Sequence, residues 1–325
     1  MEGKIAQLLT FISAIVLVLG AVDASVPAVF IFGDSTADVG NNNFLPASQA
    51  KADFLPNGID FVRSRATGRF SNGLNSADFL APSKHHSFLW HQGQVISMAK
   101  QVQYFETVRS NLIAHMGMTA TEKLLENSVF FVSTGSNDIL DYFAANGPVS
   151  RAQMIAFLSN VSVTYKGHLR QLYNLGARKI GVISIPPIGC CPSQRSLNGT
   201  SGCLEELNES ARAFYMATEA IMKDLSCELK GLKYSLGNAY EMVTNFFRNA
   251  PQLGFTELES ACCGAGKFNG ESPCLPSSSL CSNRNKYLFW DLFHPTQAAS
   301  KLAALTLFQG SEEFVTPINF GQLAS

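Results

Sequence analysis

The first buried element that the hydrophobic pattern predicts lies at residues 29–32, an unbroken apolar run of valine, phenylalanine and isoleucine. Such runs are typical of parallel strands that are buried on both faces. Glycine and polar residues follow at once, so Ser35 is expected at the carboxyl end of this strand. In open α/β sheets ligands bind at that edge.

The same pattern returns along the chain and alternates with segments of helical periodicity. Further strands are predicted at residues 128–134, 179–185 and 234–239. Helices are predicted at residues 74–80, 95–115, 150–175, 204–229, 240–249 and 296–309. Strands that alternate with helices predict a parallel sheet with helices on both faces, the α/β class. Without an internal repeat or a linker, residues 25–325 are expected to form a single domain.

The first 24 residues have the pattern of a secretory signal peptide. Lys4 supplies a positive charge, residues 8–19 an apolar core, and residues 22–24 a cleavage site of small side chains. The alternative is an uncleaved anchor, for which the apolar run is short. No later run reaches spanning length, so we expect a secreted protein whose mature chain, residues 25–325, has no membrane span.

Cysteines and glycosylation sequons agree with secretion. Two adjacent cysteine pairs and wide gaps do not match zinc-site spacings, so disulfides are expected, with one or two free thiols possible. Asparagine acceptors stand at Asn160, Asn198 and Asn208. The eight cysteines are Cys190, Cys191, Cys203, Cys227, Cys262, Cys263, Cys274 and Cys281.

Composition indicates a folded globular protein and excludes some partners. Hydrophobic residues make up 46% of the chain and charged residues 15%. A formal net charge of −1 gives no reason to expect nucleic acid or an anionic membrane as a partner. His85, His86 and His91 have no carboxylates or thiols at ligand spacing, so no metal site is predicted.

Three strand-to-loop junctions carry the side chains that serine hydrolysis needs. Ser35 is the candidate nucleophile, although a serine in this position, taken alone, more often caps the next helix. Asn137 could donate a hydrogen bond to an oxyanion. Asp291 and His294 are three residues apart in one turn, so one segment can hold both a carboxylate and an imidazole. No Gly-x-Ser-x-Gly elbow is present, which argues against the common α/β-hydrolase arrangement.

These motifs resemble those of a known family in their order and spacing. The block from Gly33 through Asn43 resembles the first block of plant GDSL esterase/lipases, a branch of the SGNH hydrolase superfamily. Residues 135–138 and 291–295 are similar to that family's third and last blocks. Residues 68–73 and 185–190 are also similar to the plant branch.

The resemblance implies a flavodoxin-like three-layer α/β/α fold and hydrolysis, or sometimes transfer, of acyl esters. Ser35 would be the nucleophile, His294 the general base and Asp291 the residue that orients it. Asn137 and the Ser35 N–H would bind the oxyanion. The partner would be a small-molecule or lipid acyl ester, and no metal or organic cofactor is implied.

One block of the family pattern has no counterpart in this sequence. The second, glycine-rich block should lie between Asp78 and Gln94, where it supplies a strand and an oxyanion donor, but Gly93 is the only glycine in residues 81–94. The resemblance therefore predicts a sheet one strand short and the loss of some tens of residues. The alternatives to an esterase are a non-catalytic secreted glycoprotein derived from one, or an acyltransferase using the same residues.

Overall fold

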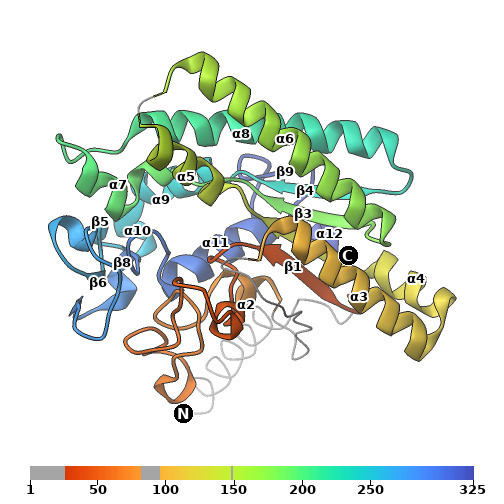
Figure 1. Ribbon diagram of the computed structural model, residues 1–325, viewed down its shortest axis with the longest axis horizontal. Helices are drawn as coiled ribbons and strands as arrows, with labels where there is room; N and C mark the ends of the chain where they lie inside the picture. Colours follow the sequence, from red (N-terminus) through yellow and green to blue (C-terminus); the bar gives the residue numbers. More distant parts are fainter. Residues whose placement is uncertain (1–25, 82–95, 148) are drawn as a thin grey trace, which may run out of the picture.

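The structure, a computed structural model, describes residues 26–81, 96–147 and 149–325, and its centre is a mostly parallel sheet (Figure 1). The sheet order is β1–β2–β3–β4–β9. The strands are β1 (Val29–Gly33), β2 (Val129–Ser133), β3 (Lys179–Ile183), β4 (Lys233–Gly237) and β9 (Val315–Thr316). The first four are parallel, and the two-residue β9 is antiparallel to β4. The predicted α/β class is confirmed.

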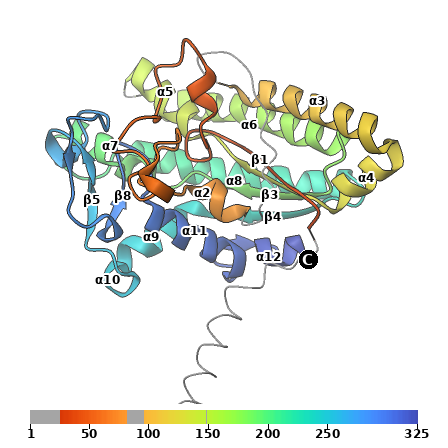
Figure 2. The same cartoon turned by 90° about the horizontal axis from the view of Figure 1, so that it is seen from below.

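Helices cover both faces of this sheet, which gives three layers (Figure 2). One layer comprises α3 (Met98–Met116), α4 (Met118–Asn127), α5 (Ser136–Asn146), α6 (Arg151–Asn174) and α8 (Glu205–Glu228). The other comprises α2 (Ser76–Leu80), α9 (Ala239–Arg248), α11 (Gln297–Gln309) and α12 (Phe320–Ala324). Successive strand residues serve opposite layers: Phe130 packs into the first and Phe131 into the second.

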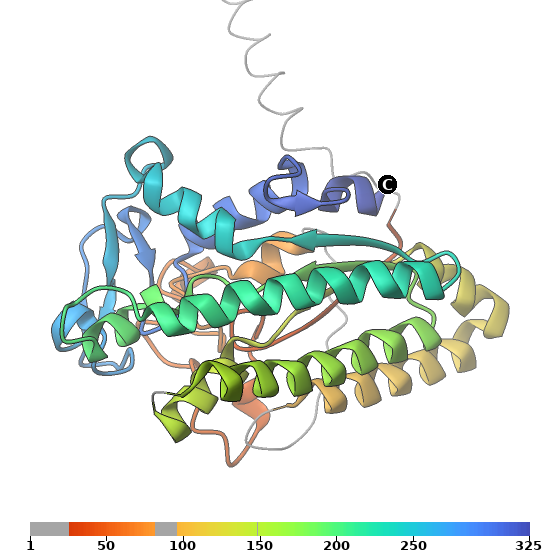
Figure 3. The same ribbon diagram turned by 90° about the horizontal axis from the view of Figure 1, so that it is seen from above.

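All six predicted helices are present, with boundaries shifted by a few residues. The predicted helix 150–175 is α6, which begins with a capping box at Ser150 and is followed by Gly176 at φ +117°. The predicted helix 95–115 is α3, and Gly117 separates it from α4. Figure 3 shows α3, α6 and α8 lying side by side on one face. Helices α4, α5 and α12 were not predicted, nor were the short helices α7 (Pro192–Leu197), in a segment expected to be loop, and α10 (Ala250–Leu253).

A cysteine-rich lobe follows α9 and supports the loop that carries Asp291 and His294. It contains α10 (Ala250–Leu253), β5 (Glu257–Ala261), β6 (Cys263–Gly264), β7 (Ser279–Leu280) and β8 (Tyr287–Phe289). Disulfides join Cys262 to Cys281 and Cys263 to Cys274, and a third joins Cys190 to Cys203 beside α7 (Pro192–Leu197). The expected disulfides are confirmed, and Cys191 and Cys227 remain free thiols.

Some sequence predictions concern residues that the structure does not describe. The signal peptide at residues 1–24 and all but the first residue of the glycine-poor stretch 81–94 lie outside the described ranges. Within those ranges no helix is long and apolar enough to cross a membrane. Strand β1 is an edge strand of the sheet as far as the described residues go, since it pairs there only with β2.

Candidate active site

Ser35 lies in a tight turn that begins where β1 ends. The Ala37 N–H donates to the Asp34 carbonyl at 3.0 Å, and the Asp38 N–H donates to the Ser35 carbonyl at 3.3 Å. The turn packs closely on β2, because a Cβ at Gly33 would lie 3.0 Å from the Ser133 carbonyl oxygen. Ser35 therefore lies at the carboxyl edge of the sheet, as the sequence predicted, with its position fixed by the strand before it.

Asp291 organises the turn that carries His294. Its Oδ1 accepts hydrogen bonds from the backbone N–H groups of Phe293 and His294 at 3.0 and 2.9 Å. The same carboxylate contacts Nδ1 of His294 at 2.7 and 2.9 Å. The ends of the turn are tied together by the Trp290 N–H, which donates to the His294 carbonyl at 2.7 Å. One carboxylate thus sets both the backbone and the ring of His294.

The fold brings this turn to Ser35 across most of the sequence. Nε2 of His294 lies 2.7 Å from Oγ of Ser35, 259 positions away along the chain. Both His294 and Asp291 are buried, at 8% and 6% exposed, so water screens this chain of hydrogen bonds weakly. The three side chains form the linear arrangement that activates a serine hydroxyl as a nucleophile.

The electrostatics of the pair suit a general base. Burial by itself would lower the pKa of His294, but the Asp291 carboxylate, through its charge and hydrogen bond, holds that pKa above the ordinary value. Burial would raise the pKa of Asp291, whereas His294 and the two backbone N–H groups hold it below its ordinary value. Asp291 is therefore ionised at neutral pH, and its charge favours an imidazolium on His294.

Phe70 also belongs to the site, although the sequence analysis assigned it no role there. Its ring stacks on the imidazole of His294, with centroids 4.8 Å apart and planes inclined by 26°. The neighbouring Arg69 makes a two-point ion pair with Asp78 of α2, at 2.7 Å for each contact. Arg69 also donates to the Val39 carbonyl in the loop after Ser35. Residues 68–73 thus connect the serine loop, α2 and the imidazole.

Asn137 lines the same cavity as Ser35 and His294. It is the second residue of α5, which begins directly after Gly135. The φ of +112° at Gly135 allows the chain to leave β2 and enter the helix. The cavity has a volume of about 1170 Å³. Aromatic side chains line much of it, including Phe54, Tyr104, Phe157 and Phe214. Such an apolar wall suits the hydrocarbon part of an ester.

The described residues contain no group of three or more histidine, cysteine, aspartate or glutamate side chains placed to hold a metal ion. His85, His86 and His91 lie outside those residues.

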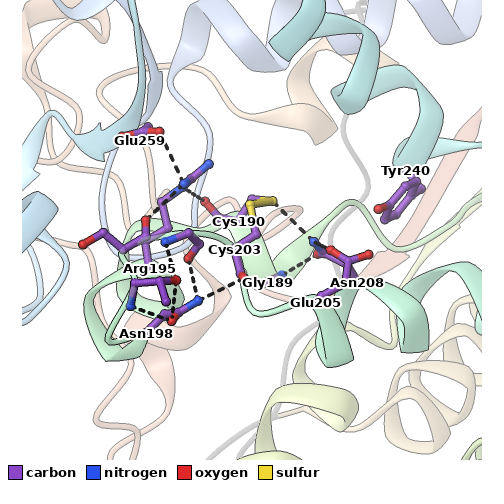
Figure 4. The surroundings of a disulfide bond; sticks show 12 residues. Gly189, Cys190, Arg195, Asn198, Cys203, Glu205, Asn208, Tyr240 and Glu259 are labelled. Atoms are coloured by element: carbon purple, nitrogen blue, oxygen red, sulfur yellow. Dashed lines mark hydrogen bonds and ion pairs between the residues drawn. A yellow bond between two sulfur atoms is a disulfide. The ribbon is translucent and has the colours of Figure 1, made fainter.

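The asparagines of the three sequons differ in accessibility. Asn160 is exposed on α6. Nδ2 of Asn198 donates to the carbonyls of Gly202 and Cys203, both at 3.1 Å. Asn208 is 2% exposed, and its Nδ2 donates to Glu205 at 3.1 Å. Figure 4 shows the last two beside the Cys190–Cys203 disulfide, with Asn208 directed into the protein.

The α/β fold and the arrangement of Ser35, His294 and Asp291 define a serine hydrolase, and comparison with known proteins agrees. Residues 29–307 match the family of GDSL-like lipases and acylhydrolases, and the chain belongs to that family. GDSL esterase/lipase At4g16230 of Arabidopsis thaliana is 34% identical over 339 residues, covering 92% of this chain and 91% of the relative. GDSL esterase/lipase At5g55050 of the same plant is 31% identical, covering 93% and 91%.

The alignment lengths also show that this chain is short relative to these proteins. Ninety-two per cent of 325 residues is about 299, so about 40 of the 339 positions aligned with At4g16230 have no residue of this chain.

Proposed function

We propose that this protein is a secreted serine esterase or lipase that forms an acyl-enzyme on Ser35. Family membership assigns carboxylic-ester hydrolysis to the chain. The observation that carries the proposed mechanism is the 2.7 Å contact between Oγ of Ser35 and Nε2 of His294, with Asp291 bound to the opposite ring nitrogen.

In the acylation step Oγ of Ser35 attacks the ester carbonyl carbon while Nε2 of His294 takes the hydroxyl proton. Asp291 keeps the imidazole in the tautomer with its proton on Nδ1 and stabilises the imidazolium that forms. Collapse of the tetrahedral intermediate breaks the bond to the leaving oxygen. His294 gives its proton to that oxygen, so an alcohol departs and the acyl group remains on Ser35.

In the deacylation step a water molecule takes the place of the alcohol. His294 removes one proton from the water as its oxygen attacks the acyl carbonyl carbon, and then returns that proton to Oγ of Ser35. The products are a carboxylic acid and the free serine. An alcohol in place of water would give a new ester, which is the acyltransferase alternative, and the same residues would serve it. Neither step requires a metal or an organic cofactor.

The proposed oxyanion donors are the Ser35 N–H and the side-chain amide of Asn137. No residue in the described ranges accepts a hydrogen bond from the Ser35 N–H, so this donor is free to bind substrate. The family pattern adds a glycine N–H from the block that this sequence lacks. Removing one such donor typically lowers kcat about 10²- to 10³-fold, so we expect a slow enzyme.

Secretion is part of the proposal. Its support is the signal-peptide pattern of residues 1–24 together with three disulfides, which persist in oxidising compartments. Expression in a eukaryotic secretory host and sequencing of the protein from the medium should give a mature chain that begins at residue 25. Retention of residues 1–24 on a membrane-bound product would instead support the anchor.

The proposal is tested by hydrolysis of a short-chain nitrophenyl ester with wild-type protein and Ser35→Ala. Ser110→Ala, which changes an exposed serine on α3, is the matched control. We expect turnover that only Ser35→Ala abolishes, and a fluorophosphonate probe that attaches to Ser35 by mass spectrometry. Equal background rates in all three folded proteins would contradict the enzyme and favour the non-catalytic glycoprotein. An added alcohol that yields ester instead of acid would favour the acyltransferase.

A further inference from the structure

The outer edge of β1 has a side chain where a neighbouring strand would be expected. Oε1 of Gln101 accepts a hydrogen bond from the Gly33 N–H at 3.0 Å, and Nε2 of Gln101 donates to the Gly33 carbonyl at 2.8 Å. Both backbone groups of one residue are therefore satisfied by one amide. An adjacent strand at this edge would satisfy the same two backbone groups.

Gln101 reaches Gly33 because α3 is anchored over β1. Phe105 follows Gln101 by one helical turn, so the two side chains project from the same side of the helix. The fully buried Phe105 ring packs against Phe30 at 5.0 Å and Phe32 at 5.8 Å. The amino end of α3 is fixed as well, since Ser97 caps it by accepting from the Lys100 N–H. The amide is thus held by a rigid helix.

We propose that Gln101 is a positioning residue for the nucleophile, replacing a strand partner at the end of β1 and holding the turn of Ser35 within reach of His294. This role rests on the proposed function of Ser35. Gly33 is separated from Ser35 only by Asp34, so movement of the strand end would carry Oγ away from Nε2 of His294. A displacement of about 1 Å can lower a rate about 10²-fold.

Gln101 acts through Gly33 and not as an oxyanion donor. Nε2 carries two hydrogens, of which one is donated to the Gly33 carbonyl and the other to the Ile96 carbonyl at 2.9 Å. Neither hydrogen is left for the substrate. The side chain therefore makes no contact with reacting atoms, and its effect on catalysis depends on where it holds the backbone.

Two substitutions separate this role from general destabilisation. Gln101→Met keeps the length of the side chain and removes the two hydrogen bonds to Gly33 together with the one to Ile96. Gln101→Glu keeps the shape, and its protonated carboxyl can donate to the Gly33 carbonyl and accept from the Gly33 N–H. The ionised carboxylate has no hydrogen to donate. The control is Gln103→Met, because Gln103 lies on the same helix with an exposed side chain.

We expect Gln101→Met to lower kcat of Ser35-dependent ester hydrolysis about 10- to 100-fold with little change in KM, and Gln103→Met to leave both unchanged. The kcat ratio of Gln101→Glu to wild type should rise as the pH falls toward the ordinary carboxyl pKa of about 4.3. Asp34 and His294 line the same cavity in both proteins, so their titration enters both kcat values and the ratio isolates the effect of the new carboxyl group.

Hydrogen exchange measures the pairing independently of activity. The Gly33 amide should exchange faster in Gln101→Met than in wild type and Gln103→Met. Unchanged exchange, equal kcat in the two methionine variants, or a pH-independent ratio for Gln101→Glu would overturn the proposal. If wild type has no Ser35-dependent turnover, the proposed function fails and the positioning role fails with it, and the exchange rates then show separately whether Gln101 pairs with Gly33.

Discussion

The carboxylate of Asp291 contacts Nδ1 of His294 at 2.7 Å and also accepts the backbone N–H of the same residue at 2.9 Å. The pair is buried and lies within one turn of four residues. Such a local pair forms whenever the turn forms. The long-range step is the docking of this turn against Ser35. The disulfide-bonded lobe supports the turn, because the Cys263 N–H donates to the Trp290 carbonyl.

The Asp291–His294 pair predicts a specific pH profile. The base must be neutral, and the Asp291 charge holds the His294 pKa above its ordinary value of about 6.5. Activity should therefore fall as the pH drops through a pKa higher than 6.5. In Asp291→Asn that acid limb should move to lower pH, and kcat should fall on the order of 10³- to 10⁴-fold. The measurement is kcat/KM of ester hydrolysis from pH 5 to 9.

A control for that profile is Asp141→Asn, because Asp141 also lines the cavity but has no hydrogen bond to His294. Its acid limb should coincide with that of wild type. An acid limb that stays in place in Asp291→Asn would contradict the assignment of His294 as the titrating base.

The stacked pair of Phe70 and His294 predicts a smaller effect on rate. An aromatic face near a cation is attractive, so Phe70 favours the imidazolium that forms in the transition state and restricts rotation of the ring. Phe70→Leu should lower kcat/KM about 2- to 10-fold and shift the acid limb toward lower pH. Phe70→Tyr keeps the stack and should behave as wild type. Equal kinetics in all three proteins would show that the stack has no part in catalysis.

The two free cysteines should react very differently with a maleimide. Cys227 is exposed, whereas Cys191 is buried, and burial together with the Asp291 charge raises the pKa of Cys191 to about 12. Thiolates are the reactive form, so native protein at pH 7.5 should gain one label by intact mass. In denaturant without reductant it should gain two. Cys227→Ser should gain none when native, and a native label on Cys191 would contradict its burial.

The sequence predicted those parts of the fold that follow from local patterns. The apolar run of β2 is buried on both faces, whereas that of β1 is buried on one face and partly buried on the other. Capped, amphipathic α6 has nearly its predicted bounds. Helix α5 was missed because its residues were interpreted only as a motif. The pattern that could have found it is Asp138 in the first turn, with Ile139 and Phe143 one turn apart. Strand β9 is two residues long, too short to show a period.

The sequence predicted which residues belong to the candidate site, but not how these residues are arranged in space. The i,i+3 spacing of Asp291 and His294 is enough to predict a local pair, and the structure has it. The contact between His294 and Ser35 depends on how two distant loops dock, which no local pattern contains. Phe70 and Gln101 were missed for the same reason, since each acts on a partner in a segment remote from it in sequence.

Among the three sequons, accessibility predicts a glycan on Asn160. The sugar attaches to Nδ2 of asparagine, and that atom of Asn208 is buried and bound to Glu205, while Oδ1 accepts the Gly189 N–H at 3.0 Å. A glycan on Asn208 would have to break both contacts beside the Cys190–Cys203 disulfide (Figure 4). Asn160 is exposed on α6, at a position that also lines the cavity of Ser35.

The glycan can be assigned by removing the sequons of Asn160 and Asn208 without touching either asparagine. Ser162→Ala should abolish the mass shift that a peptide-N-glycosidase produces at residue 160 in protein from a secretory host. The hydroxyl of Ser162 is buried without a hydrogen-bond partner, so its loss should not destabilise the fold. Ser210→Ala should leave the glycan mass unchanged. A glycan mapped to Asn208 in folded, active protein would contradict the packing around Gly189, because that side chain cannot carry a sugar and stay buried.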